Sequence, residues 1–125
     1  MPKVEVLKVK DVKATQASHM DTGAYDKYML GNVHLGGRPT ESLAVVVSVF
    51  EPGKGSGMHK HDVEEAFFIL RGRGKAVIGD KEYKLEPDTL LYAPVNVPHD
   101  FTNTGDESLV LLATFSKCTY SCERL

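Results

Sequence analysis

The chain has 125 residues, of which 42% are hydrophobic and 26% are charged, and its 15 basic and 17 acidic residues give a formal net charge of −2. This length accommodates one domain, and the composition excludes both a disordered chain and one that crosses a membrane. Because neither sign of charge forms a long block, the sequence offers no electrostatic footprint for nucleic acid, and we expect none as a partner.

The first forty residues are expected to lie outside the main barrel, as strands and a loop that serve as a subunit contact or a lid. Val4–Val9 alternates like a strand, Lys27–Leu35 is a second candidate strand, and the segment from Asp21 to Ala24 between them resembles a loop. The first twenty residues contain no uninterrupted apolar stretch of the kind found in secretion signals, so we expect a cytoplasmic protein.

From Leu43 onward, short apolar runs alternate with turn signals at intervals of about ten residues, the spacing typical of a β-sandwich or barrel. No window of about twelve residues in this half shows sustained helical periodicity. The sequence therefore predicts a single domain over residues 1–125, with an all-β core barrel over residues 43–116. The expected strands are 43–50, 66–70, 75–78, 82–85, 90–93, 99–102 and 109–115.

Two cysteines, Cys118 and Cys122, lie near the C-terminus, which is too few for a disulfide-stapled secreted scaffold. They could form a redox pair or an additional metal site. The alternative, which we favour, is a pair of ordinary thiols on a frayed tail or a local disulfide formed on purification, because a Cys-x3-Cys spacing without partner ligands is a weak signal.

Three histidines and a glutamate have the spacing of a metal site. His59 and His61 flank one residue, so on an extended backbone both imidazoles face the same way, and Glu65 follows at the start of the next apolar strand. His99 comes from a different strand, after a proline-rich bend. The alternative of two surface histidines in a charged turn explains the pair alone, but not the glutamate and the distant histidine. His19 and His34 lie outside this pattern and are expected on the surface or in loops.

The chemistry of these ligands favours a first-row transition metal over calcium or magnesium, since imidazole suits Fe, Ni or Zn and a carboxylate admits Mn and Fe. We therefore expect one divalent ion, Fe, Mn, Ni or Zn, bound by the three histidines and the glutamate. Four protein ligands on an octahedral ion would leave two positions for water, dioxygen or a bidentate substrate, as in catalytic sites.

The residues around this site carry a family resemblance. The pattern Gly53, five residues, His59-x-His61, three residues, Glu65, six residues, Gly72 resembles the first motif of the cupin family at every fixed position. The resemblance implies a double-stranded β-helix, a jelly-roll-like barrel of two antiparallel sheets, with the metal inside. It also implies a homodimer, in which N-terminal strands often pack against the partner's barrel.

The second cupin motif is present in weakened form, as Pro94-x-Asn96-x2-His99-x3-Asn103. Two glycines expected there are replaced by Asp88 and Asn96. Asp and Asn tolerate positive φ better than other non-glycine residues, so we expect the tight bends to survive both exchanges.

The lining of the substrate pocket is predicted from strand parity. Phe67 and Ile69 share parity with Glu65, and Phe101 and Asn103 share parity with His99, which would make the pocket largely apolar. Core packing is the alternative for both phenylalanines.

Three further side chains could take part in chemistry. Arg71 and Arg73 could bind a carboxylate, and Tyr92 could donate a proton near the metal. Their alternatives are a solvated turn for the arginines and a barrel-wall aromatic for the tyrosine.

The resemblance leaves the function open between two classes, because a shared fold does not settle activity. Since all four ligands are retained, we favour a metal-dependent enzyme acting on a small oxygenated metabolite, a dioxygenase or other oxidoreductase, with an isomerase or lyase next. The competing interpretation is a non-catalytic module that binds a sugar or carboxylate with the metal as an anchor. Residues 53–103 contain no obvious general acid or base, which supports this alternative.

Overall fold

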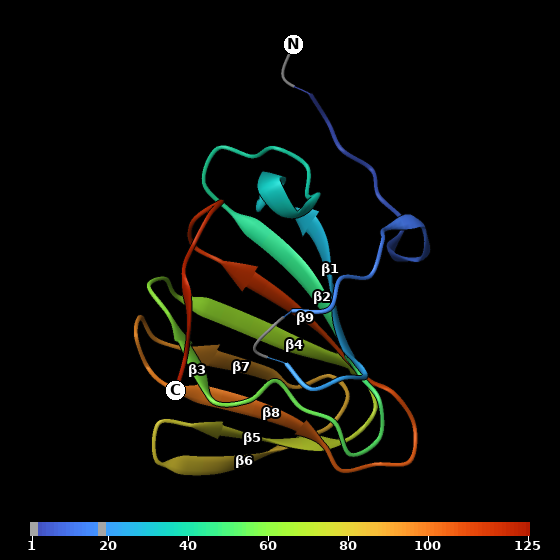
Figure 1. Ribbon diagram of the computed structural model, residues 1–125, viewed down its shortest axis with the longest axis vertical. Coiled ribbons are helices and arrows are strands. Elements are labelled where there is room, and N and C mark those ends of the chain that lie inside the picture. Colours follow the sequence, from blue (N-terminus) through green and yellow to red (C-terminus); the bar gives the residue numbers. More distant parts are fainter. Residues whose placement is uncertain (1–2, 18–19) are drawn as a thin grey trace.

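Two five-stranded antiparallel sheets pack face to face and enclose the core, as Figure 1 shows. The computed structural model describes residues 3–17 and 20–125. One sheet has the order β1-β2-β9-β4-β7 and the other β10-β3-β8-β5-β6. The strands are β1 Ala24–Leu30, β2 Ala44–Phe50, β3 His59–His61, β4 Glu65–Arg71, β5 Gly74–Ile78, β6 Lys81–Leu85, β7 Leu90–Ala93, β8 His99–Asn103, β9 Leu109–Phe115 and β10 Cys122–Arg124. This arrangement confirms the predicted all-β jelly-roll barrel.

The core lies between the two sheets because alternate residues of the central strands point inward. In β4 the buried positions are Glu65, Phe67 and Ile69, and in β8 they are His99, Phe101 and Asn103. The first residue of each strand, Glu65 in β4 and His99 in β8, is therefore a polar group that points into the interior. The same alternation that predicted these strands from the sequence positions the candidate site.

Two bends of the second motif adopt the left-handed conformation without glycine. Asp88 has φ of 65° and Asn96 has φ of 62°. The prediction that these residues would keep the bends is confirmed, since both tolerate the conformation better than other side chains do.

The first segment expected to be a strand is not one. Val4 and Val6 are 81% and 89% exposed, and the segment runs without sheet pairing into a short 3₁₀ helix, η1 Val9–Asp11. The alternation in Val4–Val9 was misleading because the backbone of this segment pairs with no neighbouring strand, although Leu7 packs against the buried cluster that contains Met29 of β1.

The second expected strand, Lys27–Leu35, has wrong bounds. The strand β1 begins earlier, at Ala24, and ends at Leu30, because Gly31 and Asn32 both adopt positive φ. The chain then forms a second 3₁₀ helix, η2 Val33–Leu35, on which His34 is exposed as expected. His19 lies outside the described residues, and the division into a segment 1–40 and a core 43–116 stays a prediction.

The C-terminal tail, expected to fray, is an edge strand. β10 pairs antiparallel with β3, with Cys122 opposite His61 and Arg124 opposite His59. Cys118 and Cys122 are both free thiols. The tail is ordered because its backbone completes the ladder of the short strand that carries two of the histidines.

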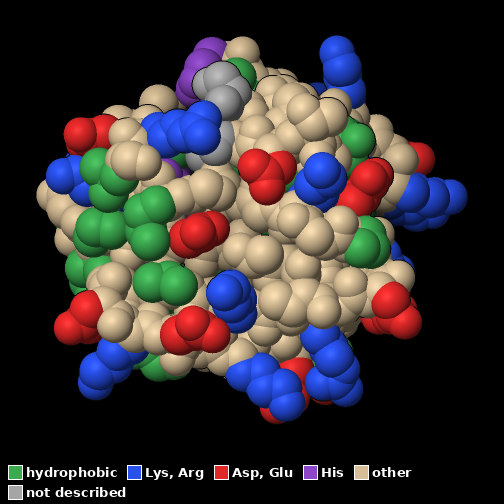
Figure 2. All heavy atoms as spheres, turned by 60° about the horizontal axis from the view of Figure 1, so that its bottom comes forward, with side chains coloured by type: hydrophobic (Ala, Val, Ile, Leu, Met, Phe, Trp, Pro, Cys, Tyr) green, Lys and Arg blue, Asp and Glu red, His purple; other side chains and the backbone are tan. Residues whose placement is uncertain are grey.

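The surface displays charges of both signs. On the face drawn in Figure 2, Lys and Arg side chains are interspersed with Asp and Glu, and hydrophobic side chains gather at one side. Among residues 3–17 and 20–125, no helix has the length and apolar character needed to cross a membrane.

Candidate metal centre

Three imidazoles converge at one end of the barrel interior. His59 on β3 is directly opposite His99 on β8, with ring centroids 4.4 Å apart, and His61 lies on the same face of β3, 4.9 Å from His59. One ring nitrogen from each of the three histidines lies within 4.8 Å of the others, and all three residues are buried. This arrangement can hold a metal ion.

Backbone carbonyls hold each imidazole in one tautomer. Nδ1 of His59 donates to the Gly57 carbonyl at 2.7 Å, Nδ1 of His61 to Ser121 at 3.0 Å and Nδ1 of His99 to Val97 at 2.9 Å. A carbonyl oxygen only accepts, so Nδ1 must carry the hydrogen, and Nε2 of each neutral ring presents its lone pair. Metal-ligating histidines are oriented by hydrogen bonds of this kind.

Glu65 completes the group from the opposite sheet. Its Oε1 lies 3.0 Å from Nε2 of His99 and 3.5 Å from Nε2 of His61. Glu65 Oε1 and His99 Nε2 are buried and neither has a hydrogen-bond partner of acceptable geometry. Lone pairs and a carboxylate oxygen that face one another at these distances repel unless a proton or a metal cation lies between them, and a donor set of imidazoles and one carboxylate fits a bound metal ion.

The electrostatics of the metal-free site are dominated by burial and by Glu65. Burial lowers the pKa of His61, against the attraction of the Glu65 carboxylate. Burial also acts to lower the pKa of His99, but the interaction with Glu65 outweighs it and raises the pKa of that imidazole. One carboxylate thus acts on two imidazoles, as expected for side chains that share one centre.

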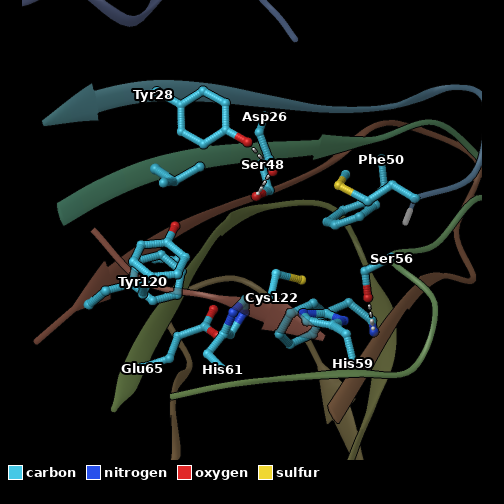
Figure 3. Close-up of a pocket in the computed structure, with 15 residues that line it drawn as sticks. Asp26, Tyr28, Ser48, Phe50, Ser56, His59, His61, Glu65, Tyr120 and Cys122 are labelled. Atoms are coloured by element: carbon cyan, nitrogen blue, oxygen red, sulfur yellow. Dashed lines mark hydrogen bonds and ion pairs between the residues drawn. The ribbon is translucent and has the colours of Figure 1, made fainter. Parts of the chain in front are cut away.

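A small cavity of about 70 Å³ opens on this group, and Figure 3 shows its lining. This volume has room for about five water molecules. One part of the wall is apolar and includes Val46, Phe50, Phe101 and Phe115. The polar part includes Asp26, Tyr28, Ser48, Ser56, Tyr120 and Cys122 in addition to His59, His61 and Glu65.

The four residues expected to line the pocket lie in different places. Phe101 lines the cavity. Phe67 and Ile69 point inward, as parity requires, but they are fully buried in the core and are not part of the cavity wall. Phe67 packs edge-on against Phe101 with ring centroids 4.5 Å apart, so it supports the wall from behind.

The Asn103 side chain links the end of β2 to the loop before β9 through hydrogen bonds. Its Nδ2 donates to the carbonyls of Phe50 and Glu107, both at 2.8 Å, and its Oδ1 accepts from the Gly105 amide at 2.8 Å. These bonds use the hydrogen-bonding capacity of a side chain that is 1% exposed. Asn103 therefore stabilises the end of β8 and does not line the cavity.

Tyr92 and the two arginines lie away from the cavity. Tyr92 on β7 is 54% exposed and borders a separate surface groove with Leu43 and Glu64. Arg71 and Arg73 are exposed, and Arg73 pairs with Glu86 at 3.5 Å. The arrangement matches the alternative of a solvated turn for both arginines.

The sequence reasoning missed the far wall of the cavity. Asp26 and Tyr28 come from β1, Ser48 from β2, and Tyr120 and Cys122 from the C-terminal segment. One signal was available, because Ser48 interrupts the apolar run 44–50, and a polar residue in a buried strand needs a partner.

Tyr120 forms the side of the cavity next to the histidines. Its ring stacks on Phe115 with centroids 4.1 Å apart and meets His61 edge-on at 5.2 Å. Its hydroxyl accepts a hydrogen bond from Asn32 at 3.2 Å, and burial raises its pKa, so it remains protonated at neutral pH. The segment after β9 thus contributes both β10 and an aromatic wall.

Comparison with known proteins finds sequence relatives among the auxin-binding proteins of plants. The chain is 31% identical over 88 residues to auxin-binding protein 4 of Zea mays, a match that covers 62% of this chain and 43% of that relative. The chain thus spans less than half the length of this relative.

Two solved structures share the fold. The polyketide cyclase RemF from Streptomyces resistomycificus superimposes with a TM-score of 0.80 at 16% identity, over 98% of this chain and 86% of RemF. Oxalate decarboxylase from Bacillus subtilis, described with Mn(II) centres, superimposes with a TM-score of 0.77 at 18% identity, over 94% of this chain and 31% of that one. At these identities the likeness concerns the fold.

A family model described as the cupin domain matches residues 46–115, more than half of the chain. The match begins in β2 and ends with β9, so it includes all three histidines and Glu65. The resemblance noted from the two motifs is therefore confirmed, and the chain belongs to the cupin family.

Proposed function

We propose that the chain is a metal-dependent enzyme acting on a small oxygenated metabolite, with His59, His61, Glu65 and His99 as the ligands of one divalent ion, Fe, Mn, Ni or Zn. The observation that carries this proposal is the buried Glu65 carboxylate oxygen, which lies within 3.5 Å of Nε2 of both His61 and His99, while Nδ1 of each of these rings is bound to a backbone carbonyl. Such a set is costly to bury without a cation, and a bound metal ion would remove the cost.

The reaction class that we favour is an oxidoreductase of the dioxygenase type, followed by an isomerase or lyase. A metal bound here would polarise a carbonyl or carboxylate of the substrate. The protein's own part is to hold the imidazoles in one tautomer and to keep water out with the apolar wall around Phe50, Phe101 and Phe115.

The size of the cavity limits the substrate. A cavity of about 70 Å³ is far smaller than the several hundred Å³ typical of sites for drug-sized ligands. A molecule that displaces about five waters has only a handful of non-hydrogen atoms. The proposal therefore takes small acids and hydroxycarbonyl compounds as the substrate class.

A second function is a non-catalytic module that binds a small molecule with the metal as its anchor. The specific observation in its favour is the match to an auxin-binding protein, whose name describes binding and not turnover. A cavity with an apolar wall and a metal-binding end could serve either function.

The first experiment measures metal content and affinity. Protein purified without added metal should contain one transition metal ion per chain by elemental analysis, and chelator-treated protein should bind Mn(II) and Zn(II) in calorimetry. His99→Gln should lose at least tenfold in affinity, whereas the control His34→Gln, at an exposed position in η2, should bind as the wild type does. Equal affinities for the two variants would overturn the metal assignment.

The second experiment separates the two functions. The Fe(II)- and Mn(II)-loaded protein is incubated with small keto acids, hydroxy acids and diketones, and oxygen consumption and products are followed. Turnover that His99→Gln abolishes would support the enzyme. Saturable binding without turnover under either metal would contradict the enzyme and support the binding module.

We also propose that the chain forms a homodimer through the sheet β1-β2-β9-β4-β7. The outer face of this sheet carries exposed apolar side chains, among them Leu70, Leu90 and Tyr92. Contiguous apolar side chains of this kind mark interaction sites. A mass of one chain by light scattering at micromolar concentration would refute the dimer, and the cytoplasmic location stays a prediction.

A further inference from the structure

A second polar group faces the candidate metal centre from the opposite wall of the cavity. Asp26 on β1 and Ser48 on β2 are register partners, and Tyr28 lies two residues along on the same face of β1. Figure 3 shows these three side chains across the cavity from His61 and Glu65. The family-model match begins at residue 46, so Asp26 and Tyr28 lie outside it.

Asp26 is held in place and still has capacity to accept hydrogen bonds. Ser48 Oγ donates to its Oδ1 at 2.6 Å, and the Tyr28 hydroxyl makes a long contact of 3.5 Å to its Oδ2. A distance of 2.6 Å is typical of a hydroxyl that donates to an ionised carboxylate. A carboxylate offers about four acceptor positions, so these two contacts leave Asp26 able to bind a donor from the cavity.

An additional hydrogen-bond donor would stabilise the ionised form of Asp26. Burial and, to a smaller extent, the charge of Glu65 raise its pKa to about 6, against the hydrogen bond from Ser48. At pH 7.5 the group is therefore charged but poorly solvated. Burial also raises the pKa of Tyr28, so that hydroxyl remains a donor and takes no negative charge.

The charges around the cavity exclude a second carboxylate at this wall. Among the described residues that line the cavity, none is lysine or arginine. A ligand carboxylate placed beside Asp26 would meet a like charge with no cation to balance it. A ligand hydroxyl placed there would instead supply the missing donor.

These observations together define the ligand. One end must carry oxygen atoms for the metal, and the other must carry a hydrogen-bond donor for Asp26. The rest of the wall includes apolar side chains such as Val46 and Phe50, which can pack against a short hydrocarbon chain.

We propose that Asp26 is the specificity-determining residue of this site, which takes small monocarboxylates with a hydroxyl at the far end and rejects dicarboxylates of the same size. This proposal rests on the proposed metal-dependent function, and it adds the substrate class and the residue that selects it. Ser48 is the positioning residue, because its hydroxyl aims the carboxylate.

The test uses three ligands that differ only at the far end. 3-Hydroxypropanoate carries a hydroxyl there, butanoate carries a methyl group, and malonate carries a carboxylate. Each is titrated by calorimetry at pH 7.5 into Mn(II)-loaded full-length wild type, Asp26→Asn, Ser48→Ala and the control Tyr92→Phe, whose hydroxyl lies outside the cavity. Mn(II) affinity and circular dichroism are measured first for each variant.

The wild type should bind 3-hydroxypropanoate at least tenfold more tightly than butanoate or malonate, since a hydrogen bond to a charged group is worth about this factor or more. Asp26→Asn should keep its Mn(II) affinity but lose most of the preference over malonate. Ser48→Ala should reduce the preference partly, and Tyr92→Phe should leave it unchanged.

The experiment distinguishes failure of the proposed metal-dependent function from failure of the proposed role of Asp26. If the folded wild type does not bind Mn(II) or any other divalent ion, the proposed function fails and this inference fails with it. If Mn(II) binds but the wild type prefers malonate, or if Asp26→Asn has the same preference as the wild type, the role of Asp26 is refuted while the metal centre stands.

Discussion

Replacing Asp26 with asparagine is expected to stabilise the metal-free protein at neutral pH and to leave it unchanged in acid. Burial raises the pKa of Asp26 from its ordinary value of 3.8 to about 6, so the folded state binds this proton more tightly than the unfolded state does. Below about pH 4 both states are protonated and the burial carries no penalty. As the pH rises to 6 the folded state loses stability, and above 6 the full penalty persists.

The size of the effect follows from the shift. A change from 3.8 to about 6 corresponds to about 3 kcal/mol of unfolding free energy, at about 1.4 kcal/mol for each pKa unit. Asparagine has nearly the same shape and keeps an oxygen that can accept from Ser48, but it carries no charge to desolvate. At pH 7.5 the variant should therefore gain up to about 3 kcal/mol, or a melting temperature higher by on the order of 10 °C.

The assay is chemical and thermal unfolding followed by circular dichroism between pH 4 and pH 8, on chelator-treated wild type and Asp26→Asn. The control Asp106→Asn removes an equal charge from the exposed loop before β9 and should give parallel curves. The reasoning is refuted if Asp26→Asn is no more stable than the wild type at pH 7.5, or if its advantage is the same at pH 4. A gain in stability at the cost of ligand selectivity is common at functional sites.

Three further predictions concern the frame of the site. Gly72→Ala should lower the melting temperature far more than Gly53→Ala. Both glycines have positive φ, but only a Cβ at position 72 would lie 2.5 Å from the Ser108 carbonyl oxygen. Equal losses of melting temperature in the two variants would contradict this prediction. Asn103→Ala should cost about 2–4 kcal/mol in urea unfolding, because it leaves the buried Phe50 carbonyl and the partly buried Gly105 amide without this partner, and a loss below 1 kcal/mol would argue against this role of Asn103. Deleting residues 118–125 removes the Ser121 carbonyl that orients His61, so Zn(II) affinity in calorimetry should fall about tenfold or more; unchanged affinity would show that the tail has no part in holding the ring.

The candidate ligands could be predicted from the sequence because their geometry is local. His59 and His61 are two apart on a strand and must share a face, and the turn from β3 into β4 brings Glu65 back to the same interior. His99 is distant in sequence, but the two cupin motifs place it on the neighbouring strand, opposite His59. The tolerance of Asp and Asn for positive φ likewise predicted the bends at 88 and 96.

The alternation of residues along each strand predicted which side chains point into the barrel, but it did not predict whether each one reaches the cavity or the packed core. Phe67 and Ile69 share the parity of Glu65, yet they are fully buried in the core and only Phe101 of the expected set reaches the cavity. Period-2 alternation selects a face of a sheet, whereas the position along the strand relative to the opposite sheet depends on how the two sheets pack.

By itself the sequence determined an all-β barrel and predicted the candidate ligands at one end of its cavity, because strand alternation, turn residues and short-range spacing are local properties. Only the tertiary structure decided the other walls, since Asp26, Ser48 and Tyr120 come from segments that are remote in the chain and meet through sheet pairing and packing. The tertiary structure also decided that Val4–Val9 is not a strand and that the C-terminal segment Cys122–Arg124 is a strand. A strand forms only where its backbone pairs with that of a neighbouring strand, and the rest of the fold decides which segments are placed to do so.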